Sequence, residues 1–278
     1  MKELKDKVAV ITGAASGIGY GLAERCAQEG MKVVLAGINQ DNLDKAQKKL
    51  KAIGASTLAV QTDVSKLEDI EILAQKTLAA FGAVHLLINN AGVAAGGTIW
   101  ESTFADWEWV MGVNLWGTLY GIKVFLPIML AQDTEAHIVN NASMAGILPH
   151  HPSSPYQVSK HAVVALSENL HHSLAERNAK VKVSVLLPGW VQSRILHAER
   201  NRPPELQNEP SMQERTPEEL AIIQQMIESL KSAMSPREYA EFAIRAVREE
   251  QFYVHSHLQY NEHIQQRFND ILASGIAL

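Results

Sequence analysis

The sequence predicts an α/β protein built on a doubly wound parallel β-sheet, with helices covering both faces. Short apolar runs alternate four times with segments of helical spacing between residues 8 and 89. The runs are continuously apolar rather than alternating, which is typical of strands buried on both faces. The joins between them are short, and this favours helices that cross directly back over the sheet.

The first half of the chain has the clearest pattern. Four strands are expected at residues 8–12, 32–36, 58–61 and 84–89. Three helices are expected between them, at residues 18–29, 41–53 and 66–81. Each helix ends at a glycine, the residue that most easily adopts the left-handed conformation after a helix C-terminus: Gly30, Gly54 and Gly82.

The second half continues the alternation and then departs from it. The expected elements are a helix at 106–132, a strand at 137–141, a helix at 155–177, a strand at 181–187, a helix from 236 to about 250 and a strand at 252–255. Pro127 is expected to distort the first of these helices near its end. Residues 193–234 are polar and long for a connection, so we expect a helical lid there. About seven strands and no internal linker predict one domain over residues 1–278.

Composition and charge narrow the class of protein. The chain has 25 basic and 30 acidic residues, a net charge of −5, which argues against a nucleic-acid-binding surface. Its single cysteine, Cys26, excludes an internal disulfide and fits a reducing compartment. We see neither a secretory signal nor an apolar run long enough to span a membrane. We therefore expect a cytoplasmic protein without a membrane partner.

A glycine-rich turn, Thr12-Gly-Ala-Ala-Ser-Gly-Ile-Gly19, joins the first expected strand to the first helix. Glycines at these positions let the pyrophosphate of a dinucleotide approach the helix N-terminus. The alternative is that the glycines only allow the strand and the helix to pack closely. Asp63-Val64 follows the third strand and Asn89-Asn90-Ala91-Gly92 the fourth. Because open α/β sheets bind ligands at the carboxyl ends of their strands, we expect Asp63 to accept from adenine and the asparagines to pack against ribose and lock neighbouring loops. Asp, Asn and Gly are also common in turns without any ligand.

Tyr156 and Lys160 lie four residues apart in the helix expected at 155–177, with Ser143 upstream. This spacing places both side chains on one helix face. An ammonium near a phenol favours the phenolate and lowers the tyrosine pKa from its reference value of about 10. With the Ser143 hydroxyl bonding a substrate oxygen, the pair would form a general acid/base near neutral pH. An isolated tyrosine and lysine at this spacing are more commonly surface residues of an amphipathic helix.

Together these motifs resemble the short-chain dehydrogenases/reductases. The matching segments keep the family's order and spacing from residue 7 to about residue 193: Thr12-Gly13-x3-Gly17-x-Gly19, Asp63-Val64, Asn89-Asn90-Ala91-Gly92, Asn114, Ser143, Tyr156-x3-Lys160 and Pro188-Gly189. The resemblance implies a Rossmann-like fold and hydride transfer between a nicotinamide cofactor and a secondary alcohol or ketone. It further implies that Tyr156 transfers the hydroxyl proton, Ser143 polarises the carbonyl, Lys160 binds the nicotinamide ribose, and Asn114 holds a water in a proton relay.

The same resemblance assigns cofactor contacts. Pro188-Gly189-Trp190-Val191-Gln192-Ser193 matches the segment that contacts the nicotinamide amide, with Ser193 in place of the usual threonine. NAD-preferring members often carry an acidic residue at the place of Gly37, so we expect NAD(P)(H) with a slight preference for NADP, although neither Ile38 nor Ser16 is basic. The expected contacts are Gly13, Ser16, Gly17, Ile18, Gly19, Gly37, Asn39, Asp63, Val64, Asn90, Ala91, Gly92, Tyr156, Lys160, Pro188, Gly189, Val191 and Ser193.

The substrate is expected to be a hydrophobic or aromatic secondary alcohol or ketone, because apolar and aromatic side chains lie near the active hydroxyls in the sequence. The lid would cover them and exclude water. The expected substrate contacts are Ala94, Ser143, Met144, His150, Tyr156 and Trp190. His255 and His257 could share one strand face, but without a nearby cysteine or acidic cluster we expect no metal.

Two other functions stay open on the same scaffold. A cofactor-retaining epimerase or dehydratase would use the same residues without releasing NAD(P)H. A nucleotide-binding regulator would need only the fold, and the presence of both Tyr156 and Lys160 counts against it. In the resembling family the helices at 106–132 and 155–177 face partner subunits, so we expect a homotetramer or a homodimer.

Overall fold

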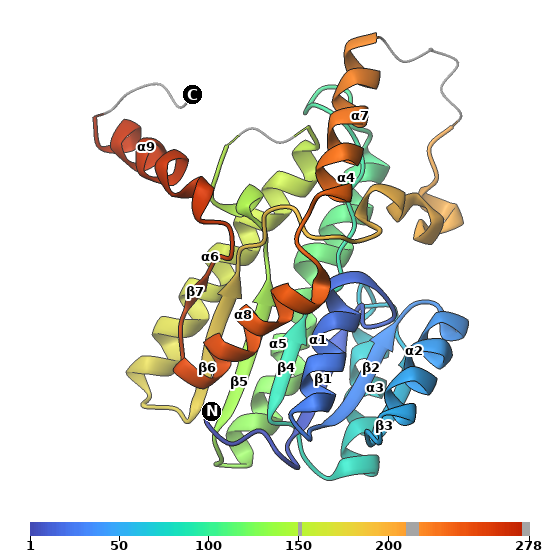
Figure 1. Ribbon diagram of the computed structural model, residues 1–278, viewed down its shortest axis with the longest axis vertical. Helices are drawn as coiled ribbons and strands as arrows, with labels where there is room; N and C mark the ends of the chain where they lie inside the picture. Colours follow the sequence, from blue (N-terminus) through green and yellow to red (C-terminus); the bar gives the residue numbers. More distant parts are fainter. Residues whose placement is uncertain (150–151, 210–216, 274–278) are drawn as a thin grey trace.

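The fold centres on a parallel sheet whose carboxyl edge carries the candidate site. In a computed structural model that describes residues 1–149, 152–209 and 217–273, seven strands pair in the order β3-β2-β1-β4-β5-β6-β7 (Figure 1). Every pairing is parallel, as predicted. The strand order reverses between β1 and β4, and such a reversal leaves a crevice for a ligand at the strand ends. The strands are β1 (Val8–Thr12), β2 (Lys32–Gly37), β3 (Thr57–Gln61), β4 (Leu86–Asn89), β5 (Ala136–Asn141), β6 (Val181–Leu186) and β7 (Tyr253–Val254).

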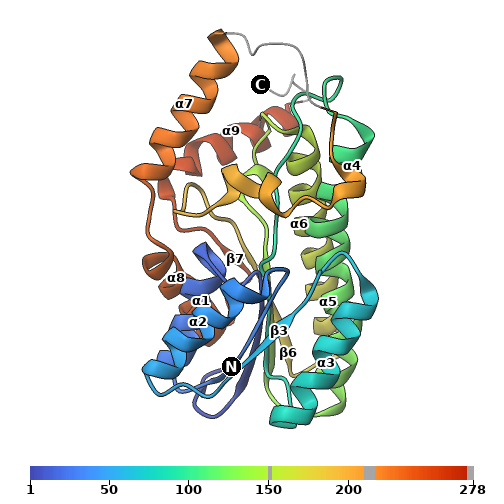
Figure 2. The ribbon, with the colours of Figure 1, turned by 90° about the vertical axis from the view of Figure 1, so that its right-hand side faces the viewer.

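Helices cover both faces of the sheet, which Figure 2 shows nearly edge-on. Side chains alternate in β1, where Ala9 and Ile11 belong to one apolar core and Val8 and Val10 to the other. The helices of the first core are α1 (Gly17–Gln28), α2 (Gln40–Ala52) and α8 (Pro236–Glu249). The helices of the second are α3 (Leu67–Phe81), α5 (Gly117–Ala131) and α6 (Ser154–Glu176).

The long helix between β4 and β5 is interrupted. It begins with α4 (Phe104–Met111), passes through a π-helical turn (Gly112–Trp116) and continues as α5 past Pro127. The π-helical turn was not predicted, because one regular helix was expected over residues 106–132. Such turns are rare and often lie at functional sites. Here the turn contains Asn114.

Two helical regions extend beyond the carboxyl edge of the sheet (Figure 1). The predicted lid contains 3₁₀ turns at Ile195–Asn201 and Pro204–Leu206 and the helix α7 (Pro217–Lys231). A 3₁₀ turn (Leu258–Tyr260) and the helix α9 (Asn261–Leu272) follow β7, and neither was predicted. The other predicted elements are found, with ends that differ by one or two residues.

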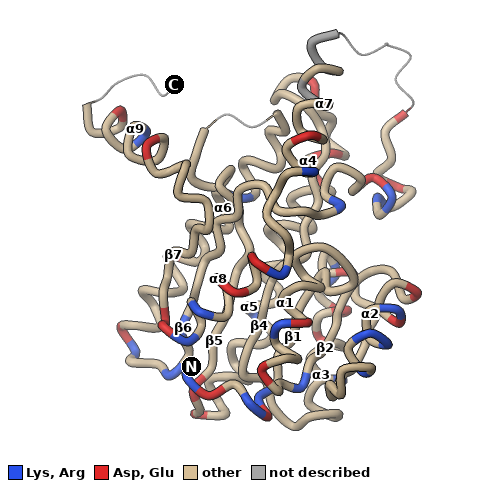
Figure 3. Tube along the Cα trace, viewed as in Figure 1, with Lys and Arg blue, Asp and Glu red and all other residues tan. Residues whose placement is uncertain are grey.

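The continuous helix from Phe104 to Ala131 is long and apolar enough to cross a membrane by length and composition, and is the one such helix among the residues described. Core helices of globular proteins meet the same criterion. This helix buries Asp106 and Asn114, both hydrogen-bonded within the protein. Charged side chains of both signs are interspersed along the chain (Figure 3). The expected absence of membrane and nucleic-acid partners stays a prediction.

Candidate active site

A cavity of about 610 Å³ opens at the carboxyl edge of the sheet and extends under the lid. Its wall brings together the glycine-rich turn, the loops after β2 to β5, the first turns of α6 and the segment after β6. Every residue expected to contact the cofactor lines this cavity, and so do Ser143, Ala94, Met144 and Trp190. His150 lies outside the described residues. Asn114 is buried behind the wall rather than in it.

The glycine-rich turn is shaped to receive an anion. Gly13 and Gly17 adopt positive φ angles of 65° and 53°, which disfavour a side chain at either position. A Cβ at Gly13 would lie 2.9 Å from the Ala91 Cα, so the two loops touch through backbone. Ser16 stands at the N-cap of α1 but makes no side-chain cap bond in the described structure. The first N–H groups of α1 are therefore left for a ligand, at the positive end of the helix dipole.

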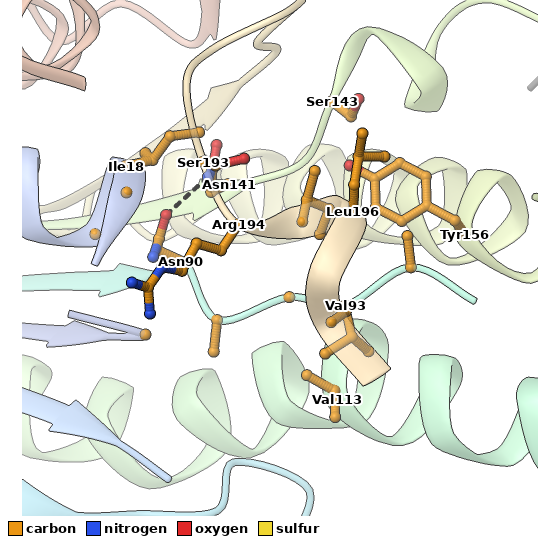
Figure 4. A pocket seen from close by; sticks show the side chains of 18 of the residues that line it. Ile18, Asn90, Val93, Val113, Asn141, Ser143, Tyr156, Ser193, Arg194 and Leu196 are labelled. Carbon is orange, nitrogen blue, oxygen red and sulfur yellow. Dashed lines mark hydrogen bonds between the residues drawn. The ribbon is translucent and has the colours of Figure 1, made fainter. Parts of the chain in front are cut away.

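The loops after β1, β4 and β5 are joined by side-chain hydrogen bonds. The Thr12 hydroxyl accepts from the backbone N–H groups of Asn90 and Ala91, at 2.9 and 3.0 Å. The Asn90 carboxamide donates to the Thr12 carbonyl at 2.9 Å and accepts from Asn141 at 2.9 Å, the bond drawn in Figure 4. Asn90 therefore locks neighbouring loops, as the sequence suggested. Asn141 was missed, although its place at the end of a predicted strand could have indicated it.

The end of the cavity near β2 and β3 is polar and weakly charged. Asn39 caps α2 by accepting from the Asn42 N–H at 2.9 Å. Asp63 accepts from the N–H and the hydroxyl of Ser65, at 3.1 and 2.7 Å. Asp63 is the only charged side chain that the described cavity wall contributes from residues 37–65.

Ser143, Tyr156 and Lys160 converge from two elements. Ser143 follows β5, and Tyr156 and Lys160 share one face of α6, as predicted from their spacing. The Ser143 hydroxyl is hydrogen-bonded to the Tyr156 phenol, and the two groups point into the cavity together (Figure 4). The Lys160 Nζ donates to the Asn141 carbonyl at 2.8 Å and lies 5.5 Å from the centroid of the Tyr156 ring.

Burial dominates the protonation of this trio. It raises the pKa of Tyr156, while the hydrogen bond from Ser143 acts in the opposite direction. Burial also lowers the pKa of Lys160 to about 8, because the ammonium loses solvation. The sequence-based prediction of a lowered tyrosine pKa is therefore wrong for the protein alone, since burial of the phenol outweighs the hydrogen bond from Ser143.

Asn114 holds a loop in place. Its carboxamide oxygen accepts from the Val93 N–H at 2.9 Å. Its NH₂ group donates to the Val93 carbonyl at 3.0 Å and to the Ser159 hydroxyl at 2.9 Å. Both donors are thus occupied by protein, and the side chain binds the loop after β4 to α6. A relay water, if Asn114 holds one as predicted, must therefore bind to groups other than the Asn114 NH₂.

The first part of the lid is fixed by a buried ion pair. Arg202 lies 2.8 Å from Asp106, and both side chains are buried. The guanidinium also stacks over Trp109, 5.1 Å from its centroid, and Asn208 bonds both charged groups. This arrangement holds an apolar wall on the substrate side of the cavity. Sequence reasoning missed Trp109 and Val113 as wall residues, whereas Val93 was expected in the wall and Leu196 and Ala198 belong to the predicted lid.

A free helix N-terminus at a strand reversal, connected by one cavity to a Ser-Tyr-Lys trio, defines the class: a dinucleotide-binding oxidoreductase. The family model described as short chain dehydrogenase matches residues 7–204. The chain belongs to this family, as its motifs indicated.

Three similar proteins span the whole chain. The CLA biosynthesis dehydrogenase/reductase of Lactiplantibacillus plantarum is 35% identical, covering 99% of this chain and 96% of the relative. A C alpha-dehydrogenase of a Sphingobium species is 30% identical, covering 99% of this chain and 88% of the relative. The crystal structure of a short chain dehydrogenase/reductase from Burkholderia phymatum in complex with NAD is 42% identical, with a TM-score of 0.95 and coverage of 100% and 98%.

Proposed function

We propose that the protein interconverts a secondary alcohol and a ketone by hydride transfer with a nicotinamide cofactor, and that Tyr156 is the general acid/base. The observation that carries this proposal is the position of Ser143, Tyr156 and Lys160 on a cavity wall that continues to the uncapped N-terminus of α1. The trio can move a proton at one end, and the helix can hold a pyrophosphate at the other.

The residues of the cavity fit a dinucleotide. The glycine-rich turn would hold the pyrophosphate, Asp63 the adenine amino group, and the 188–193 segment the carboxamide of the nicotinamide. When bound, the nicotinamide supplies or accepts the hydride.

NAD is the cofactor that we propose. The expected slight preference for NADP gains no support, because the similar structure from Burkholderia phymatum contains NAD. Among the described cavity residues of the loops after β2 and β3 there is also no lysine or arginine that could attract a 2′-phosphate, and the arginines of the wall, Arg194 and Arg200, come from the lid. A hundredfold or greater preference for NADP in kcat/KM, on the order of 3 kcal/mol, would contradict this choice.

Each catalytic side chain then has one task. In the direction of reduction, Ser143 donates a hydrogen bond to the carbonyl oxygen and Tyr156 gives that oxygen its proton. In the direction of oxidation, Tyr156 takes the proton back. Lys160, oriented by the Asn141 carbonyl, offsets the negative charge that develops on the phenol. The apolar wall keeps water from the reacting carbon.

We propose a hydrophobic or aromatic substrate, with Met144 and Trp190 among its contacts. Support comes from the side chains around the trio, since Val93, Trp109 and Leu196 present hydrocarbon or ring surface to the cavity. A pocket lined in this way favours substrates with bulky apolar groups, and the lid can close over them.

The test is a panel of aryl, alkyl and sugar alcohols and ketones, followed by the absorbance of NADH and NADPH with each cofactor. We expect NADH to be formed or consumed with apolar members of the panel. Turnover confined to small polar sugars would contradict the substrate class. A substrate converted without any change in free NADH would favour an epimerase or dehydratase, and binding of NADH without turnover of any compound would favour a regulator.

We also propose that the chain forms a homotetramer or a homodimer through its long helices, with a cytoplasmic location. Trp116 and Leu130 on the long helix and Val158 on α6 are exposed apolar side chains that a second copy would cover. Light scattering should give two or four times the chain mass of 30.6 kDa. A monomer at every concentration measured would contradict the assembly.

A further inference from the structure

His257 lies after β7, far in sequence from every catalytic motif, and yet it contacts the segment after β6. The imidazole is buried. Its Nδ1 accepts from the Gly189 N–H at 3.2 Å. Its Nε2 donates to the Trp190 carbonyl at 3.0 Å. One side chain thus holds two consecutive residues of the segment that, under the proposed function, contacts the nicotinamide.

The geometry allows one protonation state of the ring. The backbone N–H of Gly189 can only donate, so Nδ1 must be the acceptor. The carbonyl of Trp190 can only accept, so Nε2 must carry the hydrogen. The Ser256 hydroxyl lies 2.8 Å from Nδ1 and can donate to it as well. Burial lowers the pKa of His257, although the Trp190 carbonyl acts in the opposite direction, and this favours the neutral ring that both bonds require.

Packing reinforces the two hydrogen bonds. A Cβ built on Gly189 would lie 2.7 Å from the Tyr260 Cε2 and 2.9 Å from the His257 Cγ. The backbone at Gly189 is therefore pressed against both rings, and Tyr260 itself lines the cavity. At the other end of the segment, a Cβ at Gly17 would lie 3.2 Å from the Ser193 Cβ. The 188–193 segment is thus placed between the C-terminal region and the glycine-rich turn.

We propose that His257 is a positioning residue that fixes the nicotinamide end of the cofactor site by holding Gly189 and Trp190 in place. The inference rests on the proposed function and deepens it. It assigns a role at the site to the region after β7, which lies outside the part of the chain that the family model matches. His257 touches the backbone of Gly189 and Trp190 and acts through it, so its removal should affect binding of the nicotinamide half of the cofactor and leave binding of the adenosine half unchanged.

A matched pair of variants tests this. Asn has an oxygen where His has Nδ1, so H257N keeps the acceptor for the Gly189 N–H. Leu has nearly the same shape as Asn but no polar atom, so H257L loses both hydrogen bonds. Titration calorimetry with NADH and with ADP-ribose, which lacks the nicotinamide, separates the two halves of the site. We expect H257L to bind NADH roughly tenfold more weakly than wild type. H257N should recover much of this loss, and all three proteins should bind ADP-ribose alike.

Wild-type affinity of H257L for NADH would overturn the proposal, and so would an equal loss for both ligands, which would indicate a general structural role. H255L is the control from the same segment, because the buried His255 Nδ1 has no hydrogen-bond partner in the described structure. It should bind both ligands as wild type does. If H257L does not fold, H257Q replaces it in the same titrations. Gln keeps only the donor to the Trp190 carbonyl, so H257Q should also bind NADH more weakly than wild type but bind ADP-ribose as tightly. Failure of the proposed function would look different, because wild type itself would not bind NADH.

Discussion

The cofactor end and the substrate end of the cavity are held together in different ways. At the cofactor end, Thr12, Asn90 and Asn141 bond one another and the backbone at the ends of adjacent parallel strands. At the substrate end, the first part of the lid depends on one buried ion pair, Arg202 with Asp106. The described residues of α7 beyond it bond mainly within their own helix.

This difference separates a preformed half from an adjustable half. Several short hydrogen bonds to backbone fix the cofactor loops before any ligand arrives, so binding there has little ordering cost. The substrate wall has one strong anchor at Arg202, and no described residue of α7 belongs to a buried apolar core, so we expect that α7 can change its position without disturbing the core.

The largest effect is expected from K160M at the cofactor end. Loss of the ammonium should reduce turnover by a factor of roughly 10² to 10⁴, as for other groups that support proton transfer. The same change removes a buried cation whose pKa is lowered to about 8, and should therefore raise the free energy of unfolding at pH 7 by about 1–3 kcal/mol. Steady-state kinetics and thermal unfolding measure the two effects. Turnover within tenfold of wild type would contradict the assignment.

R202M should have the largest effect on stability at the substrate end. It leaves the Asp106 carboxylate buried without its cation, which should cost about 3 kcal/mol of unfolding free energy and raise KM for the substrate. The affinity for NADH should not change. K231M is the control within the lid, because it breaks the exposed pair with Glu228 and should cost less than about 1 kcal/mol. Equal losses in the two variants would show that the ion pair does not anchor the lid.

T12V should weaken the cofactor end without touching the lid. Val has the shape of Thr but cannot accept from the N–H groups of Asn90 and Ala91, which should cost about 1–3 kcal/mol and weaken NADH binding. T77V removes another buried threonine hydroxyl, one that only donates to a helix carbonyl, and should be nearly neutral. Chemical denaturation and calorimetry measure both quantities. An NADH affinity unchanged in T12V would argue against a preformed site.

The smallest effect is a pH dependence that belongs to the cofactor end. Burial lowers the pKa of Lys160 to about 8, so its ammonium is present below that pH and lost above it. Burial raises the pKa of Tyr156, so the phenol stays protonated over this range. The kcat/KM for ketone reduction should be level below pH 8 and fall by up to about tenfold per pH unit above it. A level profile up to about pH 10 would show that the ammonium is not required.

The same division explains how much could be predicted from the sequence. Features set by residues close together in the sequence could be predicted. These are the strands, the glycine-rich turn and the shared helix face of Tyr156 and Lys160, and the structure confirms their placement. The Arg202–Asp106 pair joins residues almost one hundred positions apart in the sequence, and no local sequence pattern predicts such a contact. The raised pKa of Tyr156 depends on burial that spacing alone does not reveal. One omission was avoidable, because Ile264, Phe268 and Ile271 have the helical spacing of α9.

The most direct test of the account is Y156F, measured with the best ketone of the panel and with NADH. Phe keeps the ring and its packing but has no proton to give. We predict that kcat falls by a factor of roughly 10³ while the Kd for NADH stays within about threefold of wild type. Turnover that survives the loss of the hydroxyl would contradict the claim that this phenol moves the substrate's proton.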